Sequence, residues 1–229
     1  MANYTVSILT DDVFNGGNLA AETADGGGLS LREALALANG NGNASDNITF
    51  APGLAGGTLF LTNGELGIST DAITIDGDIN GNDTPDITIS ADSALGANDA
   101  DTRVLTISDS NAGTTISATL NGLVIRDGNA LPSMYQAAAN GGGIYVREGD
   151  AVTLTNSALL DNTATGSGGG IGGQEVSITV RHSTIAGNTA SSDHGGGIYN
   201  TGHHRGDRFD RRGQPGHRWR WRWHCRLPQ

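Results

Sequence analysis

The tetrapeptide Gly168-Gly169-Gly170-Ile171 also occurs at residues 141–144 and 195–198, so it recurs with a step of 27 residues. A second repeat relates residues 156–164 to 182–190, where Ser, Asn, Thr and Ala recur after 26 residues. Periods of this length, with short β-prone runs between glycines, are typical of strands wound into stacked coils. One coil cannot bury its own apolar face, so neighbouring coils must build the core together. The repeats therefore predict an all-β solenoid of parallel strands.

These coils are expected at residues 48–201, as short β-branched strands separated by Gly, Asn or Asp. The segment before them, residues 1–47, is predicted to form an N-terminal cap. It contains a predicted strand at 3–9, a loop rich in Gly, Asn and Asp up to Gly28, and a helix at 30–39.

The predicted helix has a clear start signal. Ser30 is followed three residues later by Glu33, which fits a capping box. Its apolar residues form one narrow stripe with helical spacing: Leu31, Ala34, Leu35 and Ala38. A single helix with such a stripe is expected to cover the open end of the stack, which would otherwise expose the apolar interior.

Charge is distributed unevenly along the chain. Residues 1–201 contain 22 acidic residues and 5 arginines, for a net charge of −17, and the whole chain has no lysine. Such a body should repel nucleic acids and anionic membranes and favour divalent cations or a saline exterior. No apolar run is long enough to span a membrane, and no N-terminal secretory signal is visible. Either a cytoplasmic protein or export by another route fits these features.

The C-terminal segment, residues 202–229, differs from the rest in composition. It contains 8 arginines, all three tryptophans and the single cysteine, Cys225. An Arg/Trp segment that binds membranes or nucleic acid is one interpretation, but the helical periodicity this needs is missing. We favour a frame shift: read one base later, the codons of Trp219, Trp221 and Trp223 each encode glycine, which would continue the repeat. Residues 202–229 are therefore predicted to be non-native and disordered.

The stretch Leu29-Ser30-Leu31-Arg32-Glu33-Ala34 resembles the N-terminal Cys-Ser-Leu-Arg-Glu-Ala motif of bacterial surface and secreted right-handed parallel β-helix proteins, with Leu29 in place of the motif's Cys. The Gly-Gly-Gly-Ile and Asn-Thr-Ala coils are similar to the polymorphic outer-membrane and adhesin-like repeats of that group. The resemblance covers roughly residues 1–200. It implies a right-handed parallel β-helix, an extracellular or cell-surface location without a classical signal peptide, and an N-terminal fragment of a longer protein.

Residues 76–86 are the best candidate for a metal site. Ca²⁺ prefers six to eight oxygen ligands, and a D-x-D-x-N-G pattern offers several in a tight turn. Ile87 stands where an EF-hand has its closing Glu, so a solvated turn between two strands is the alternative. The predicted ligands are Asp76, Asp78, Asn80, Asn82, Asp83 and Asp86.

Asn162 and Asn188 each precede Thr-Ala, one coil apart. Buried asparagines at equivalent positions can bond to each other and to the backbone, so a structural ladder is predicted here.

Catalysis on this scaffold would need acids, arginine or histidine on one exposed face. The candidates are Arg126, Asp127, Asp161, Arg181, His182, Asp193 and His194. Alignment of the repeats places Arg126 beside Asp161 on successive coils, either in a polysaccharide lyase or hydrolase site or as an ordinary surface ion pair.

The favoured function is a secreted or cell-surface, adhesin-like module that binds extracellular glycans or proteins. A polysaccharide lyase or glycoside hydrolase on the same scaffold is the alternative, and a structural spacer is a third. The body has no tryptophan and few tyrosines, which argues against a sugar-cleaving cleft. Neither nucleic acid nor a membrane span is expected.

Overall fold

The computed structural model describes residues 1–25, 27–70, 72–92, 102–109, 114–131, 139–191 and 194–201. Its described strands form four sheets, all with parallel pairing. Sheet A contains β1 (Ala2–Val6), β2 (Ser45–Phe50), β5 (Ala72–Asp76), β8 (Ser117–Asn121), β12 (Ala151–Thr155) and β16 (Ser177–Arg181). Sheet B contains β3 (Thr58–Phe60), β6 (Ile87–Ser90), β9 (Leu123–Arg126), β13 (Ala158–Leu160) and β17 (Thr184–Ala186).

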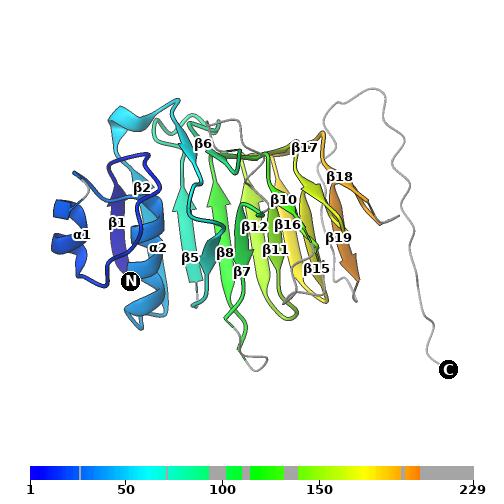
Figure 1. Cartoon of the computed structure of the whole chain (residues 1–229), viewed down its shortest axis with the longest axis horizontal. Helices are drawn as coiled ribbons and strands as arrows, with labels where there is room; N and C mark the ends of the chain where they lie inside the picture. The colour runs from blue at the N-terminus through cyan, green and yellow to red at the C-terminus, as the bar shows by residue number, and fades with distance from the viewer. Residues whose placement is uncertain are drawn as a thin grey trace.

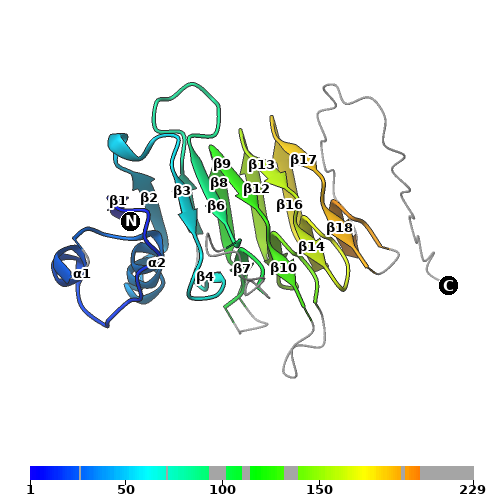
Figure 2. The same cartoon turned by 45° about the horizontal axis from the view of Figure 1, so that its top comes forward.

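Sheet C contains β4 (Leu66–Ile68), β7 (Leu105–Ile107), β11 (Ile144–Val146), β15 (Ile171–Gln174) and β19 (Ile198–Thr201). Sheet D is short and contains β10 (Asn129–Ala130), β14 (Thr163–Ala164) and β18 (Thr189–Ala190). From β2 onward the chain visits sheets A, B and C in turn, and its last three circuits add a strand of sheet D between B and C. Equivalent strands therefore lie next to one another along the length of the molecule (Figures 1 and 2).

The glycine triplets lie in register, as the repeat predicts. Ile144 pairs with Ile171, which in turn pairs with Ile198. The first glycine of each triplet has a positive φ: 67° at Gly141, 69° at Gly168 and 56° at Gly195. A Cβ atom on Gly168 would clash with the backbone carbonyl of Ile171, so glycine is required both by the left-handed conformation and by close packing.

The core is built from alternate residues of each strand. In sheet A, the four paired residues Ile48, Ile75, Leu120 and Leu154 are all at most 1% exposed. Burying such a side chain contributes roughly 1.5–3 kcal/mol. At the far end of the column Val180 is only partly buried, because β16 is the last strand of this sheet among the described residues.

The predicted asparagine ladder is confirmed. Asn162 is fully buried, and its Nδ2 donates to Oδ1 of Asn188 at 2.9 Å and to the carbonyl of Ile125 at 3.1 Å. Its Oδ1 accepts the backbone N–H of Gly128 at 2.9 Å, just as Oδ1 of Asn188 accepts the backbone N–H of Asn162 at 3.0 Å. Each amide side chain thus satisfies the turn of the preceding circuit.

Helix α2 (Leu31–Gly40) agrees closely with the helix predicted at 30–39. Ser30 is its N-cap, and the capping box with Glu33 is complete. The predicted apolar stripe is buried, and α2 contacts β1, β2 and β4, the strands at one end of the sheets. Figure 1 shows α1, α2 and β1 together at this end and β18 and β19 at the other.

Three details differ from the sequence prediction. Helix α1 (Leu19–Asp25) replaces part of the loop expected before Gly28, because Asn18 accepts the N–H groups of Ala20 and Ala21 and caps its start. The predicted boundary after residue 47 falls inside β2, and β1 pairs with β2, so the segment predicted as a cap contributes strand residues to sheet A. The Asn-Thr-Ala repeats also form strands, in sheet D.

The predicted frame-shifted segment, residues 202–229, lies outside the described residues, so that prediction stays open. In the described part of the chain, no helix combines the length and apolar character needed to cross a bilayer.

Candidate functional site

The loop predicted to bind calcium connects β5 to β6 and is held by its own polar side chains. The two carboxylate oxygens of Asp78 accept the backbone N–H groups of Asn82 and Asp83, each at 3.0 Å. Asp86 accepts the backbone N–H of Asn80 at 3.1 Å and its Nδ2 at 2.8 Å. The side-chain oxygen of Asn82 accepts the N–H of Thr84 at 2.9 Å. Side chains of this kind commonly stabilise turns by such bonds.

The ends of the loop are tied to neighbouring strands. Asp76 accepts a hydrogen bond from Nδ2 of Asn121 at 2.8 Å, and Asp83 accepts one from Nδ2 of Asn156 at 2.9 Å. The six predicted ligands therefore point to different donors, and no cluster of three or more His, Cys, Asp or Glu that could hold a metal occurs among the described residues. Calcium binding by these six residues stays a prediction.

Arg126 and Asp161 are near each other, but the closer partner of Arg126 is its neighbour. Nε of Arg126 lies 2.7 Å from Oδ2 of Asp127, whereas its guanidinium lies 3.9 Å from Asp161. The hydrogen bond with Asp127 is the main cause that raises the pKa of Arg126. Asp127 also accepts the hydroxyl of Ser90 at 2.8 Å. With Arg126 half-exposed, this arrangement is that of a surface ion-pair cluster.

The other catalytic candidates lie elsewhere. Arg181 ends β16 and His182 follows it, one strand beyond Thr155 and Asn156 in sheet A. His182 comes just before β17, whereas Asp161 comes just after β13, the strand that pairs with β17 in parallel. The two residues therefore lie at opposite ends of the sheet B strands.

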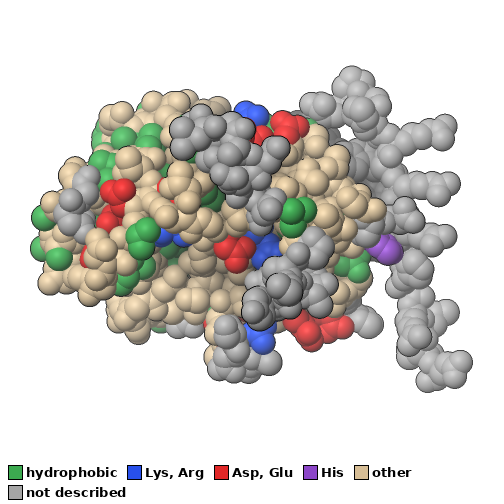
Figure 3. All heavy atoms as spheres, in the orientation of Figure 1, with side chains coloured by type: hydrophobic (Ala, Val, Ile, Leu, Met, Phe, Trp, Pro, Cys, Tyr) green, Lys and Arg blue, Asp and Glu red, His purple; other side chains and the backbone are tan. Residues whose placement is uncertain are grey.

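Of the last two candidates, His194 packs near Tyr199, with ring centroids 5.6 Å apart, and Asp193 lies outside the described residues. The candidates that are described thus do not converge on one site. In the view of Figure 3, acidic and basic side chains likewise occur in small separate groups.

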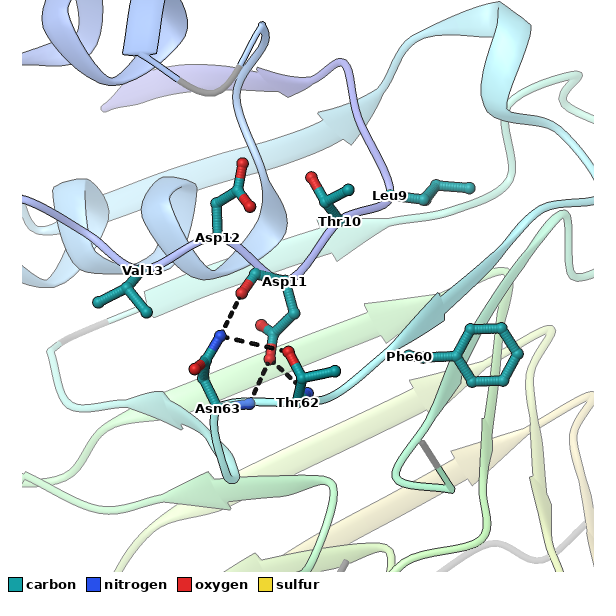
Figure 4. A pocket seen from close by; sticks show the side chains of 8 residues that line it. All are labelled: Leu9, Thr10, Asp11, Asp12, Val13, Phe60, Thr62 and Asn63. Carbon is teal, nitrogen blue, oxygen red and sulfur yellow. Dashed lines mark hydrogen bonds between the residues drawn. The ribbon is translucent and has the colours of Figure 1, made fainter. Parts of the chain in front are cut away.

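A shallow open depression of about 440 Å³ lies beside the cap, lined by Leu9, Thr10, Asp11, Asp12, Val13, Phe60, Thr62 and Asn63. Its central acid has a structural role. Asp11 is buried and accepts the backbone N–H groups of Thr62 and Asn63, each at 2.8 Å (Figure 4). Arg32 donates two further hydrogen bonds to Asp11, at 2.7 and 3.0 Å.

The outward face of sheet A, a regular surface of six paired strands in the described part of the chain, was not predicted from the sequence. Its central column contains Asn3, Asn47, Thr74, Thr119, Thr153 and Thr179, paired in register across six strands. The alternation of buried and partly exposed residues in each strand was a signal for this face. The columns themselves could not be predicted, because the sequence does not state which residues of neighbouring strands pair when the repeats differ in length.

No protein-family model, curated protein or solved structure matches this chain.

Proposed function

We propose that the chain is a right-handed parallel β-helix and that it acts as a secreted or cell-surface, adhesin-like binding module. The repeated visit to sheets A, B, D and C, with parallel pairing throughout the described strands, supports this architecture. A right-handed sense is the expected one, because crossovers between parallel strands are right-handed in nearly all proteins.

The outward face of sheet A is the observation that carries the binding function. It is continuous over six paired strands and consists mainly of Thr, Ser and Asn. Repeat proteins use such extended surfaces to bind extended partners. An acidic body without lysine suits an extracellular environment.

The rival enzymatic function receives less support from the geometry. A glycosidase needs two carboxyl groups at a set separation around the substrate, and a lyase needs a base near the sugar proton. Arg126 and Asp161 form part of an exposed ion-pair cluster, while Arg181 and His182 lie at a different corner.

Binding and catalysis are distinguished by one experiment. The purified chain is applied to arrays of neutral and acidic glycans and of extracellular proteins, and soluble polysaccharides are assayed for new reducing or unsaturated ends, with and without calcium. We expect saturable binding without new ends. Absence of binding to every array member, or new ends that disappear in Asp161→Ala, would contradict the proposal.

Calcium binding by residues 76–86 remains a prediction with its own test. If the loop carboxylates turn to bind the ion, Ca²⁺ at 100 times its Kd should raise the free energy of unfolding by about 2.7 kcal/mol. Asp78→Asn should abolish this increase. An unfolding curve that is identical in calcium and in a chelator would show that the loop is held by its own hydrogen bonds alone.

A further inference from the structure

The outward residues of sheet A form three columns that run across the strands. Beside the central column of Asn3, Asn47, Thr74, Thr119, Thr153 and Thr179 lies a column of Ser45, Ala72, Ser117, Ala151 and Ser177. The third column contains Thr5, Thr49, Asp76, Asn121, Thr155 and Arg181. Because neighbouring strands of a sheet are about 4.8 Å apart, polar groups recur at this interval along each column.

The hydroxyl groups in the middle of this face bond to none of the residues that the structure describes. Within the described part of the chain, the hydroxyls of Thr74, Thr119, Thr153 and Thr179 make no hydrogen bond, although all four side chains are partly buried by their neighbours. By contrast, Thr163 and Thr189 in sheet D lie with their hydroxyls 3.0 Å apart. The central hydroxyls of sheet A are therefore available to a ligand.

These hydroxyls are also held in place. Thr is β-branched and has restricted χ1 rotamers in a strand, and each of the four lies in a strand paired on both sides or, for Thr179, on one side. When a ligand binds, these threonine side chains lose little conformational entropy, which favours binding.

The charge of the face limits the ligand. Among the described residues in the three columns, only Asp76 and Arg181 are charged, so these columns carry no net charge, whereas residues 1–201 together carry −17. A polyanion such as an acidic polysaccharide would gain nothing at this face and would be repelled by the rest of the body. A polycation would bind acidic regions instead.

We infer that the outward face of sheet A binds a neutral, extended polysaccharide that lies across the strands along the threonine column. This inference rests on the proposed binding function and specifies its ligand class. Sugar hydroxyls both donate and accept hydrogen bonds, as threonine hydroxyls do, and sugar C–H groups can pack on the threonine methyl groups. The distance from β2 to β16 is about 19 Å along the column, so several sugar units are contacted at once.

The test compares two double variants by affinity electrophoresis in gels containing a soluble neutral β-glucan, a galactomannan or acidic polygalacturonate. Thr119→Val with Thr153→Val removes two hydroxyls from the face while keeping β-branched side chains. Thr88→Val with Thr184→Val makes the same change on the outward side of sheet B, where these hydroxyls also have no partner among the described residues. Thermal unfolding of both variants checks that the fold is retained.

We expect a neutral polysaccharide to retard the wild-type chain and the sheet B variant equally. The sheet A variant should bind about tenfold more weakly, the loss expected for two hydrogen bonds. Equal retardation of both variants would overturn the inference and leave the binding function standing. Binding only to polygalacturonate or to proteins on the arrays would do the same. Absence of binding to any glycan or protein would overturn both.

Discussion

Two polar columns in this molecule arise from the same repeat but serve different purposes. Inside, Asn162 and Asn188 lie one circuit apart, and their side-chain amides bond to each other and to the backbone. Outside, Thr153 and Thr179 are also one circuit apart and in register, but their hydroxyls have no partners within the described residues. Every buried polar group needs a partner, whereas an exposed one can use water until a ligand replaces it.

This difference indicates where substitutions should affect stability and where they should affect binding. The buried polar groups hold turns and elements together, so their loss leaves unsatisfied atoms in the core. The outward hydroxyls of Thr119, Thr153 and Thr179 bond to no described residue. A large loss of stability from the outer column, or none from the inner one, would therefore contradict the assignment.

The largest loss of stability is expected in the N-terminal segment, where Arg32 and the buried Asp11 form an ion pair. Arg32→Ala leaves the fully buried carboxylate of Asp11 without its charged partner and also removes hydrogen bonds to the carbonyls of Gly64 and Glu65. We expect the free energy of unfolding to fall by about 3–5 kcal/mol in chemical denaturation. The exposed Arg181→Ala is the matched control and should change stability by less than about 0.5 kcal/mol.

A smaller loss of stability is expected in the inner column, where Asn162 and Asn188 differ in burial. Asn162→Ala removes the partner of the Gly128 N–H and the Ile125 carbonyl in a site closed to water, so a loss of about 1–3 kcal/mol is expected. Asn188→Ala should cost less, because Asn188 is only partly buried and water can replace its side chain. Equal losses for the two variants would count against the ladder as described.

Asp150 is an exception among the buried polar groups, because only one of its oxygens is satisfied within the described residues. Oδ1 accepts a hydrogen bond from the N–H of Ile116 at 3.0 Å, while Oδ2 has no partner in the described part of the chain. Burial raises the pKa of Asp150 and the nearby Asp109 raises it further, against the lowering effects of the Ile116 N–H and of Arg147.

A raised pKa means that the folded protein binds this proton more tightly than the unfolded chain does. The resulting stability is present below the ordinary Asp pKa of about 3.9 and is lost as pH rises through the raised value. The free energy of unfolding of Asp150→Asn should therefore fall less over this pH range than that of the wild type. Parallel pH profiles of the two proteins would refute the assignment.

The smallest effect is expected for the outer column. Thr119→Val with Thr153→Val removes hydroxyls that bond to no described residue and keeps the β-branched shape, so the free energy of unfolding should stay within about 0.5 kcal/mol. Differential scanning calorimetry checks this. A loss as large as that of Asn162→Ala would show that the hydroxyls have a structural role.

Much of this arrangement could be predicted from the sequence, because some residue patterns occur mainly in one local conformation. Glycine triplets mark positions where a positive φ and close backbone packing exclude other residues, and the capping box at Ser30 marks the start of a helix. The 26-residue echo around Asn162 identified the internal ladder, because a buried amide needs an equivalent partner one circuit away.

Other features depend on the pairing of distant strands or on which of several nearby groups a side chain contacts, and the sequence gives only weak signals for these. Helix α1 has seven residues and lacks an apolar stripe, and its start depends on the side chain of Asn18. Arg126 lies 3.9 Å from Asp161, as the alignment of the repeats predicts, but its closer partner is the adjacent Asp127, at 2.7 Å, which the alignment did not predict. The outward face of sheet A required strands such as β5 and β8 to be aligned across a long insertion.

The central claim is that successive repeats lie next to one another in register, and spin labels test it directly. With Cys225→Ser as background, nitroxides are placed at Thr153 and Thr179, which pair across β12 and β16. A control carries them at Thr153 and Thr184, which lie in different sheets. We predict strong spin–spin broadening of the electron paramagnetic resonance spectrum for the first pair and a much weaker effect for the second. Equal broadening in both pairs, or none in the first, would contradict the stacked arrangement.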